Sequence, residues 1–216
     1  MIKHWNKEWI KWCFSPTLFV SSYYKKRALT PKDRGKRVRF LNKTYFTIAC
    51  LLFAGIMIVH QLGMMNQLPC FLVVLYIFWC LSRVNEIFMA FIKDVFDKLN
   101  PRKRKKNGLE YYERIALALR SFVELVLNYA MLYYILDTYF VRYGFWEGLF
   151  NQPLQDPLTA LYFSLITIVS IGYGDYYPIQ DISKLLIMYE IINGLLLLVV
   201  SFTVYVGLDL DEKEAS

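Results

Sequence analysis

Charge is missing from a long part of this sequence. No Asp, Glu, Lys or Arg occurs in the 39 residues from Thr44 to Ser82, although about 20 apolar residues suffice to cross a bilayer once as a helix. A soluble helical bundle needs a polar face on its outer helices, so this run excludes that class. Segment 62–69 contains glycine, asparagine and proline and predicts a turn. We therefore expect two spans within the uncharged run.

Two further apolar segments follow, at about 115–141 and 182–208. Each is long enough to cross a bilayer as a helix. The sequence therefore predicts an all-α integral membrane protein with four transmembrane helices. The first 20 residues alternate charged and aromatic residues and lack an apolar core, so no cleavable signal peptide is expected.

Residues that commonly carry chemistry are also scarce. The four cysteines form no closely spaced pair, and most lie in predicted spans, where a thiol acts as a small hydrophobe. The two histidines, His4 and His60, have no carboxylate or cysteine cluster around them in the sequence. We therefore expect no enzyme, no disulfide framework and no cofactor.

Basic residues are concentrated on one side of the predicted spans. Residues 1–43 hold twelve Lys and Arg against two acidic residues, whereas the 62–69 turn holds none. A second basic run lies at 100–107. Basic loops stay cytoplasmic, so we expect both termini inside, 62–69 and 142–181 outside, and a plasma-membrane location. This placement accounts for the charge without a nucleic-acid partner.

Both basic regions also suggest contact with lipid. At the N-terminus, Ile2, Trp5, Trp9 and Trp12 share one helical face, which predicts an amphipathic helix in the headgroup region or, alternatively, one packed on a partner or on a loop of the chain. The second region is either a lipid-binding cluster for anionic headgroups or a solvated topology determinant. It consists of Arg102, Lys103, Arg104, Lys105 and Lys106.

Composition divides the chain into five regions. They are a basic cytoplasmic region at 1–43, a transmembrane hairpin at 44–92, a polybasic loop at 93–113, a region at 114–208 with the last two spans and the segment between them, and a short tail at 209–216. No ligand-binding regulatory domain is expected in that tail.

A half-length helix is predicted between the third and fourth spans. Asp156 followed by Pro157 is typical of a helix start, and 158–169 is apolar but only about half as long as a membrane span. We expect this helix to enter from outside and to stop part way. The next residues, Ser-Ile-Gly-Tyr-Gly-Asp at 170–175, are non-helical, and such backbone is tolerated at membrane depth only inside protein or along an aqueous path.

This arrangement resembles the pore module of tetrameric potassium channels, whose filter usually reads Thr-Val-Gly-Tyr-Gly-Asp. Serine and isoleucine stand here at the first two positions. The resemblance implies that backbone carbonyls replace the hydration shell of K⁺, the permeant ion, and that four chains surround it as a homotetramer or a heterotetramer. The ion-binding residues it implies are Ser170, Ile171, Gly172, Tyr173 and Gly174, the carbonyls of the first four facing the pore.

Four further residues receive roles through the same resemblance or their position in it. Asp175 is expected at the outer mouth, hydrogen-bonded behind the filter. Thr167 is a filter support or an ordinary helical core residue. Glu190 lies within the fourth span, where a carboxylate needs a proton or a partner from the pore helix or the third span. Gly194 is a gating hinge or a site of close helix packing.

The function predicted is passive, potassium-selective conduction without a recognisable voltage sensor. A voltage sensor needs several gating charges, whereas Arg83 stands alone near Glu86. Two alternatives stay open: a modulatory or non-conducting pore subunit, and a weakly selective cation channel.

Overall fold

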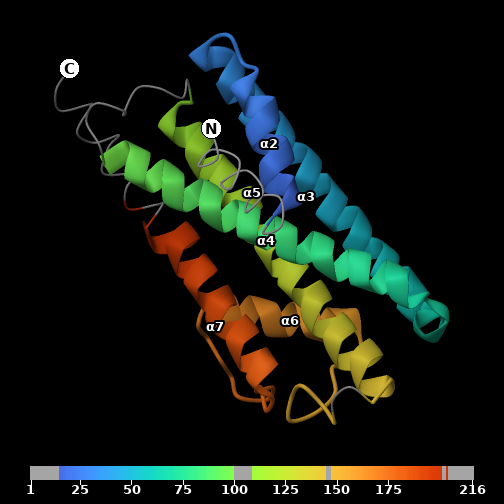
Figure 1. The fold of residues 1–216 in the computed structure, drawn as a ribbon. Helices are drawn as coiled ribbons and strands as arrows, with labels where there is room; N and C mark the ends of the chain where they lie inside the picture. The colour runs from blue at the N-terminus through green and yellow to red at the C-terminus, as the bar shows by residue number, and fades with distance from the viewer. Residues whose placement is uncertain (1–14, 100–108, 145–146, 201–202, 204–216) are drawn as a thin grey trace, which may run out of the picture. The chain divides into compact units, whose positions relative to one another are not determined.

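The chain folds as a set of long helices (Figure 1). Of its 216 residues, the computed structural model describes 15–99, 109–144, 147–200 and 203. These described residues contain no β-strand, and four of their helices are long and apolar enough to cross a membrane. The predicted fold class, an all-α integral membrane protein, is confirmed. The interfacial helix predicted near the N-terminus lies outside the described residues.

The four membrane-crossing helices fall where the sequence places them. They are α3 (Pro31–Gln61), α4 (Cys70–Leu99), α5 (Tyr111–Ile135) and α7 (Asp181–Leu195). The turn between α3 and α4 contains a short 3₁₀ helix, η1 (Met65–Gln67), inside the predicted 62–69 turn. The last turns of α5 and α7 widen into π-helices, η2 (Leu136–Phe140) and η3 (Leu196–Val200). Such π-helical turns often occur near functional sites.

The described chain divides into two compact units, and α3, α4 and α5 each contribute residues to both. Unit 1 comprises Met1–Phe46, Leu81–Phe122 and Leu196–Ser216, and unit 2 comprises Thr47–Cys80 and Val123–Leu195.

Unit 1 contains a helix that the sequence analysis did not predict, α2 (Pro16–Lys26). Ser15 caps it, with Pro16 at the first helical position, a common pair at helix starts. Three buried hydroxyls hold α2 to α4: Ser15 Oγ donates to the carbonyl of Ser82 at 2.7 Å, and Thr17 Oγ1 lies 2.8 Å from Ser82 Oγ. The Ser-Pro pair was the signal that could have revealed this helix.

Polar contacts also join α3, α4 and α5 within unit 1. Arg114 of α5 donates to both carboxylate oxygens of Asp94 of α4, at 2.9 and 2.7 Å. Asn42 of α3 donates to Ser121 of α5 at 2.9 Å. Both bonds to Asp94 come from one guanidinium nitrogen, Nη1, and hydrogen bonds between charged groups are stronger than neutral ones, so these contacts help to hold α3, α4 and α5 together within this unit.

Unit 2 has an aromatic core along α5. Tyr129, Tyr133 and Tyr134 are almost fully buried. The ring of Tyr133 meets Phe163 and Phe150 edge to face, with centroids 5.3 and 5.6 Å apart, a favourable arrangement for aromatic pairs. Phe163 belongs to the half-length helix α6 (Pro157–Ile168), so this cluster packs α6 against α5.

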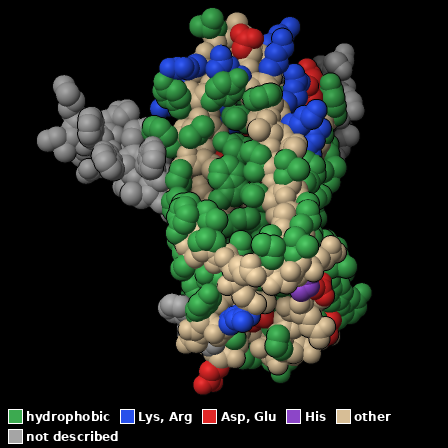
Figure 2. All heavy atoms as spheres, turned by 90° about the vertical axis from the view of Figure 1, so that its right-hand side faces the viewer, with side chains coloured by type: hydrophobic (Ala, Val, Ile, Leu, Met, Phe, Trp, Pro, Cys, Tyr) green, Lys and Arg blue, Asp and Glu red, His purple; other side chains and the backbone are tan. Residues whose placement is uncertain are grey.

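The outside of the helices is apolar over much of its area. Leu51, Phe71 and Leu185 are 67%, 65% and 61% exposed. Figure 2 shows many hydrophobic side chains on the face drawn. An exposed apolar surface of this kind fits contact with lipid tails, which agrees with a multi-pass membrane protein.

The start of α6 is fixed by Asp156, as the sequence predicted. Its carboxylate accepts hydrogen bonds from the backbone N–H and the hydroxyl of Thr159, at 2.8 and 2.9 Å. Partial burial opposes ionisation of Asp156, but the hydrogen bonds from Thr159 and the backbone N–H of Leu158 outweigh it and hold the pKa of this carboxyl below its ordinary value. The cap therefore works best when Asp156 is charged.

We predict that Asp156→Ala lowers the free energy of unfolding by about 1 kcal/mol, the usual cost of losing an N-cap. Because the folded-state pKa is depressed, the contribution of Asp156 is present above the unfolded pKa and is lost as pH falls through the folded pKa. Thermal unfolding in detergent micelles across an acidic pH series measures this. Asp156→Asn is the control, since it keeps a capping oxygen and should remove the pH dependence of this cap. An unchanged pH dependence in Asp156→Asn would contradict the assignment.

Candidate functional site

The end of α6 supplies hydrogen-bond acceptors to the segment that follows it. The backbone N–H of Ser170 donates to the carbonyl of Thr167 at 2.9 Å. The N–H groups of Ile171 and Gly172 both donate to the carbonyl of Ile166, at 2.9 and 3.3 Å. These bonds satisfy orphan carbonyls at the helix end and tie the first three residues of the segment to α6.

Every second residue of segment 170–174 has a left-handed backbone. The φ angles of Ser170, Gly172 and Gly174 are 59°, 53° and 83°, whereas those of the two residues between them are negative. A left-handed residue at every second position departs from both helical and extended strand backbone. Glycine adopts this conformation at little cost, so two of the three positions have the residue that the geometry needs.

The carbonyl oxygens of segment 170–174 form an unpaired row. Within the described part of the chain, no hydrogen-bond donor contacts them. The segment is exposed, with Ile171 and Tyr173 at 53% and 69%. A backbone carbonyl that no protein group satisfies is available to water, to a cation or to another copy of the chain.

Asp175 is held from two directions just after this row. Its carboxylate accepts from the hydroxyl of Tyr162 on α6 at 2.9 Å. Its backbone carbonyl accepts from the side-chain amides of Asn151 and Gln152, at 3.0 and 3.1 Å. The ring of Tyr162 also stacks on that of Tyr173, with centroids 6.5 Å apart and planes 4° apart. The outer end of the segment is therefore braced by α6 and by the loop before it.

The loop before α6 is itself anchored by Asp137 of η2. The Asp137 carboxylate accepts from the backbone N–H groups of Leu149 and Leu154, at 3.2 and 2.8 Å. An isolated antiparallel bridge joins Phe150 to Pro178. This loop thus pairs with the residues that follow segment 170–174 and fixes both of its flanks.

Glu190 is completely buried between three elements of unit 2. It accepts a hydrogen bond from the hydroxyl of Tyr133 of α5 at 2.6 Å, and its other carboxyl oxygen lies 2.5 Å from the hydroxyl oxygen of Ser164 of α6. The sequence analysis expected partners in one of these two elements, and the structure has one in each. Ser164 Oγ also lies 3.0 Å from the carbonyl of Val126, and its single hydrogen cannot serve both acceptors. Every acceptor has a hydrogen when Glu190 carries a proton and donates to Ser164, which in turn donates to the carbonyl of Val126.

Gly194 lies where α7 passes closest to the end of α6. A Cβ atom at this position would stand 2.5 Å from Cγ1 of Ile168 and 3.0 Å from its carbonyl oxygen. Neighbouring Asn193 is buried and donates to the hydroxyl of Tyr129 at 3.2 Å. Of the two interpretations left open for Gly194, close packing therefore has a direct structural basis, and the role of hinge stays a prediction.

Two predictions remain, the supporting role of Thr167 and the basic cluster. Thr167 is half-buried, and its carbonyl accepts the Ser170 N–H. The basic cluster at 102–106 lies outside the described residues. Sequence reasoning missed Tyr133, Tyr162 and Asn151, because tyrosine and asparagine have no fixed spacing relative to the segments they brace.

We predict that Gly194→Ala lowers the free energy of unfolding by about 1–3 kcal/mol, the usual cost of overpacking. Gly55→Ala is the matched control, because Gly55 also lies in a helix but has no atom within 4 Å of an added Cβ; it should be neutral or slightly stabilising. Thermal unfolding of the purified variants measures both. Equal melting temperatures for the two would contradict the packing interpretation and favour a hinge.

A second prediction concerns Glu190. Glu190→Leu should cost about 1–3 kcal/mol of stability, because it leaves the buried hydroxyl of Tyr133 without an acceptor. Glu190→Gln keeps an oxygen acceptor and an N–H donor in the same place, so we expect a much smaller loss. Melting temperatures in the same detergent compare the two. The assignment is wrong if leucine is tolerated as well as glutamine.

Comparison with known proteins agrees with this geometry. Residues 121–208 match the family described as "Ion channel". A stretch of 61 residues is 36% identical to the "Voltage-gated potassium channel Kch" of Escherichia coli (strain K12), and it covers 28% of this chain and 14% of that protein. No solved structure gives a significant match. The match to this relative is thus confined to a small part of its length. Over residues 121–208 this chain is therefore similar to ion channels, and over a shorter stretch it is similar to a potassium channel.

Proposed function

We propose that this protein is a potassium-selective ion channel that conducts K⁺ passively through a pore surrounded by four copies of the chain. The observation that carries the proposal is the set of unpaired carbonyls in segment 170–174, with left-handed residues at alternate positions. Rings of backbone carbonyls replace the hydration shell of K⁺ in channels that select it. In this proposal the carbonyls of Ser170, Ile171, Gly172 and Tyr173 line the pore, and Gly174 completes the filter.

The position of α6 supports the same reading. This helix ends at Ile168, directly before the carbonyl row, and the C-terminal end of a helix carries partial negative charge. Four such ends around one axis favour a cation below the filter. In this proposal Thr167 supports the inner end of the row, Asp175 lies at the outer mouth, and Glu190 positions α6 from behind.

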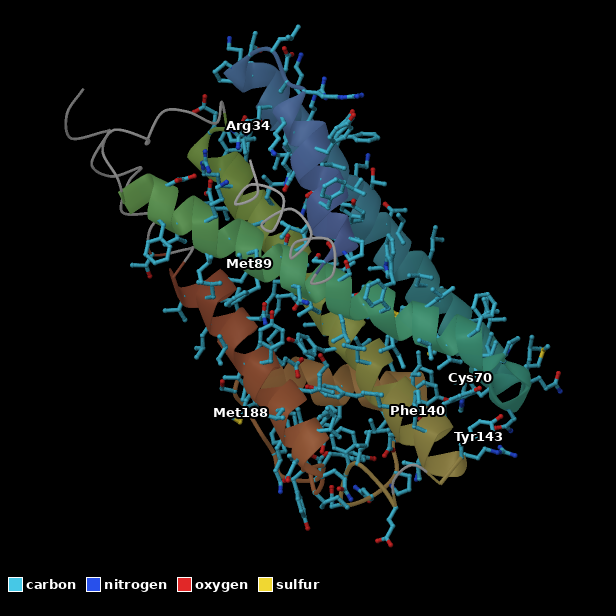
Figure 3. The ribbon with its side chains drawn as sticks, viewed as in Figure 1. Arg34, Cys70, Met89, Phe140, Tyr143 and Met188 are labelled. Atoms are coloured by element: carbon cyan, nitrogen blue, oxygen red, sulfur yellow. The ribbon has the colours of Figure 1, made fainter. Side chains whose placement is uncertain are left out.

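We propose a tetramer because one chain cannot surround an ion with ligands. A single chain supplies one strand of carbonyls, whereas a dehydrated ion needs ligands on all sides. An apolar stripe on α7 is also uncovered: Leu185, Met188, Ile192 and Leu195 are 61%, 58%, 51% and 49% exposed, and Met188 points away from the helix (Figure 3). In the homotetramer this stripe lines the pore or contacts the next copy.

The proposed orientation rests on charge. Unit 1 carries exposed basic residues beside the uncharged run, including Lys26, Lys32 and Lys36, and the positive-inside rule puts this end in the cytoplasm. Both termini are then cytoplasmic, in the plasma membrane. Arg83 is not placed as a gating charge, since it is buried, pairs with Glu86 and packs its guanidinium over the ring of Tyr45. We propose conduction with weak or absent voltage dependence.

The prediction is tested by the reversal potential of the purified protein in a planar bilayer, with K⁺ on one side and Na⁺ on the other. We expect a reversal near the potassium equilibrium potential. Gly172→Ala should move the reversal toward zero or abolish the current, because alanine resists a φ of 53° by roughly 1–2 kcal/mol. Gly63→Ala is the matched control, since Gly63 has a similar φ of 65° and equally open space around it, and it should leave selectivity unchanged.

The alternatives give different results in the same experiment. Robust current that reverses near zero in the unmodified protein would indicate a weakly selective cation channel, and attention would turn to Ser170 and Ile171. Absence of current from a purified tetramer would indicate a modulatory or non-conducting subunit. Loss of selectivity in both glycine variants would mean that the effect comes from general destabilisation and not from the filter.

A further inference from the structure

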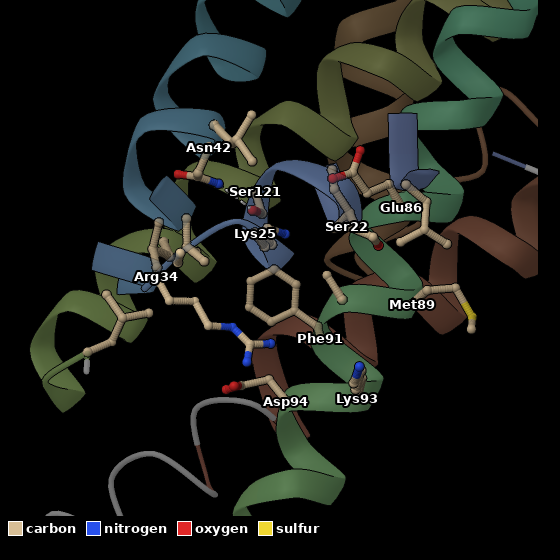
Figure 4. A pocket seen from close by; sticks show the side chains of 18 of the residues that line it. Ser22, Lys25, Arg34, Asn42, Glu86, Met89, Phe91, Lys93, Asp94 and Ser121 are labelled. Atoms are coloured by element: carbon tan, nitrogen blue, oxygen red, sulfur yellow. Dashed lines mark hydrogen bonds between the residues drawn. The ribbon is translucent and has the colours of Figure 1, made fainter. Parts of the chain in front are cut away.

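Unit 1 contains a cavity of ≈ 640 Å³ between α2, α3, α4 and α5. Figure 4 shows it from close by, with the ring of Phe91 in the opening and Lys25, Arg34 and Lys93 around it. These three cations come from three different helices, α2, α3 and α4. The channel function proposed above does not use this cavity.

The charge around the cavity is unbalanced. Six basic and three acidic residues line it. Two of the acids are already engaged: Glu86 pairs with Arg83, and Asp94 pairs with Arg114. Asp97 is the third acid. Within the described part of the chain, the side chains of Lys25, Arg34 and Lys93 make no ion pair.

The cations affect one another across the cavity. Burial lowers the pKa of Lys25 below its ordinary value, and Glu86 opposes this shift. The positive charges of Arg83, Arg34 and Lys93 lower the pKa of Lys25 further. An anion between these side chains would relieve their mutual repulsion, so the arrangement favours a negatively charged occupant.

The rest of the lining is suited to an amphiphile. Apolar side chains such as Val38, Ile87 and Leu117 form part of the wall. The site therefore offers cations for a phosphate and an apolar wall for an acyl chain.

The position along the helices identifies the level of the cavity in the membrane. The last residue of α3 that lines the cavity is Tyr45, and the first residue of α4 that lines it is Arg83. These two residues lie at the two ends of the uncharged run from Thr44 to Ser82. Charged residues at the ends of a hydrophobic run lie at headgroup depth. Phosphate groups of lipids are concentrated at that depth.

We infer that this cavity is a binding site for a phosphate group, supplied by an anionic phospholipid whose phosphate lies among Lys25, Arg34 and Lys93 and whose acyl chain follows the apolar wall. A soluble phosphate compound shares the headgroup chemistry but gains nothing from that wall, so the lipid is the source that fits both parts of the site.

The test measures binding of fluorescently labelled phosphatidylglycerol to the full-length protein in detergent micelles, with labelled phosphatidylcholine as the comparison. The test variant is Lys25→Gln/Lys93→Gln. The control is Lys32→Gln/Lys36→Gln, which removes the same two charges from exposed lysines on α3 that do not line the cavity. We expect the test variant to bind phosphatidylglycerol at least about tenfold more weakly, since each basic side chain near anionic lipid contributes roughly a fivefold effect. The control should change little.

Two further measurements test the shape of the cavity and the source of the phosphate group. Ala90→Phe keeps every charge but fills part of the cavity, whose wall includes Ala90, and should also weaken phosphatidylglycerol binding; unchanged melting temperatures show that the variants fold. Inorganic phosphate at millimolar concentration is the competitor. Competition by phosphate, without preference for phosphatidylglycerol over phosphatidylcholine, would keep the phosphate site but assign it to a soluble ligand. Equal losses in both lysine variants, or no binding of either probe, would overturn the inference.

Discussion

The architecture of unit 2 depends on how a short apolar helix is held against its neighbours. α6 has twelve residues, too few to cross a bilayer of about 30 Å, so in the proposed channel its end and the backbone after it lie where water is scarce. Backbone groups in that region must be satisfied within the protein. The structure does this on the donor side, because three consecutive N–H groups after Val169 return to carbonyls of α6. The backbone carbonyls of segment 170–174 are then left as acceptors without donors among the described residues.

A buried acid holds α6 against α5 and α7. Glu190 joins α7 to α5 through Tyr133 and to α6 through Ser164. Hydroxyl partners allow this side chain to stay inside the membrane, where an unpaired carboxylate would be expensive. On the same helix Gly194 lets the backbone of α7 approach Ile168. One polar and one steric contact, about one helical turn apart, therefore set the packing of α7 on α6.

Much of this arrangement could be predicted from sequence, because each signal was local. The uncharged run at 44–82, the Asp156–Pro157 start and the brevity of α6 are properties of consecutive residues. Glu190 was also recognisable, since a lone acid in an apolar span requires a partner. The identity of its partners was not, because Tyr133 lies 57 residues away and resembles the other tyrosines of α5. Helix α2 was missed for a different reason: its core contacts are the hydroxyls of Ser15, Thr17 and Ser82, which hydrophobic periodicity does not detect.

In the proposed channel, the carbonyl groups of segment 170–174 link ion binding to the assembly of several chains. In one isolated chain the acceptors of segment 170–174 face the exterior, together with the apolar side chains of Ile171 and Val169. Each unsatisfied backbone group at membrane depth costs several kcal/mol, and lipid cannot provide donors. A second chain would cover the apolar side chains, but it would present an identical row of acceptors and no donors. A shared cation or water column would satisfy acceptors from every copy at once, which is why the proposed function joins ion binding to the assembly of several copies.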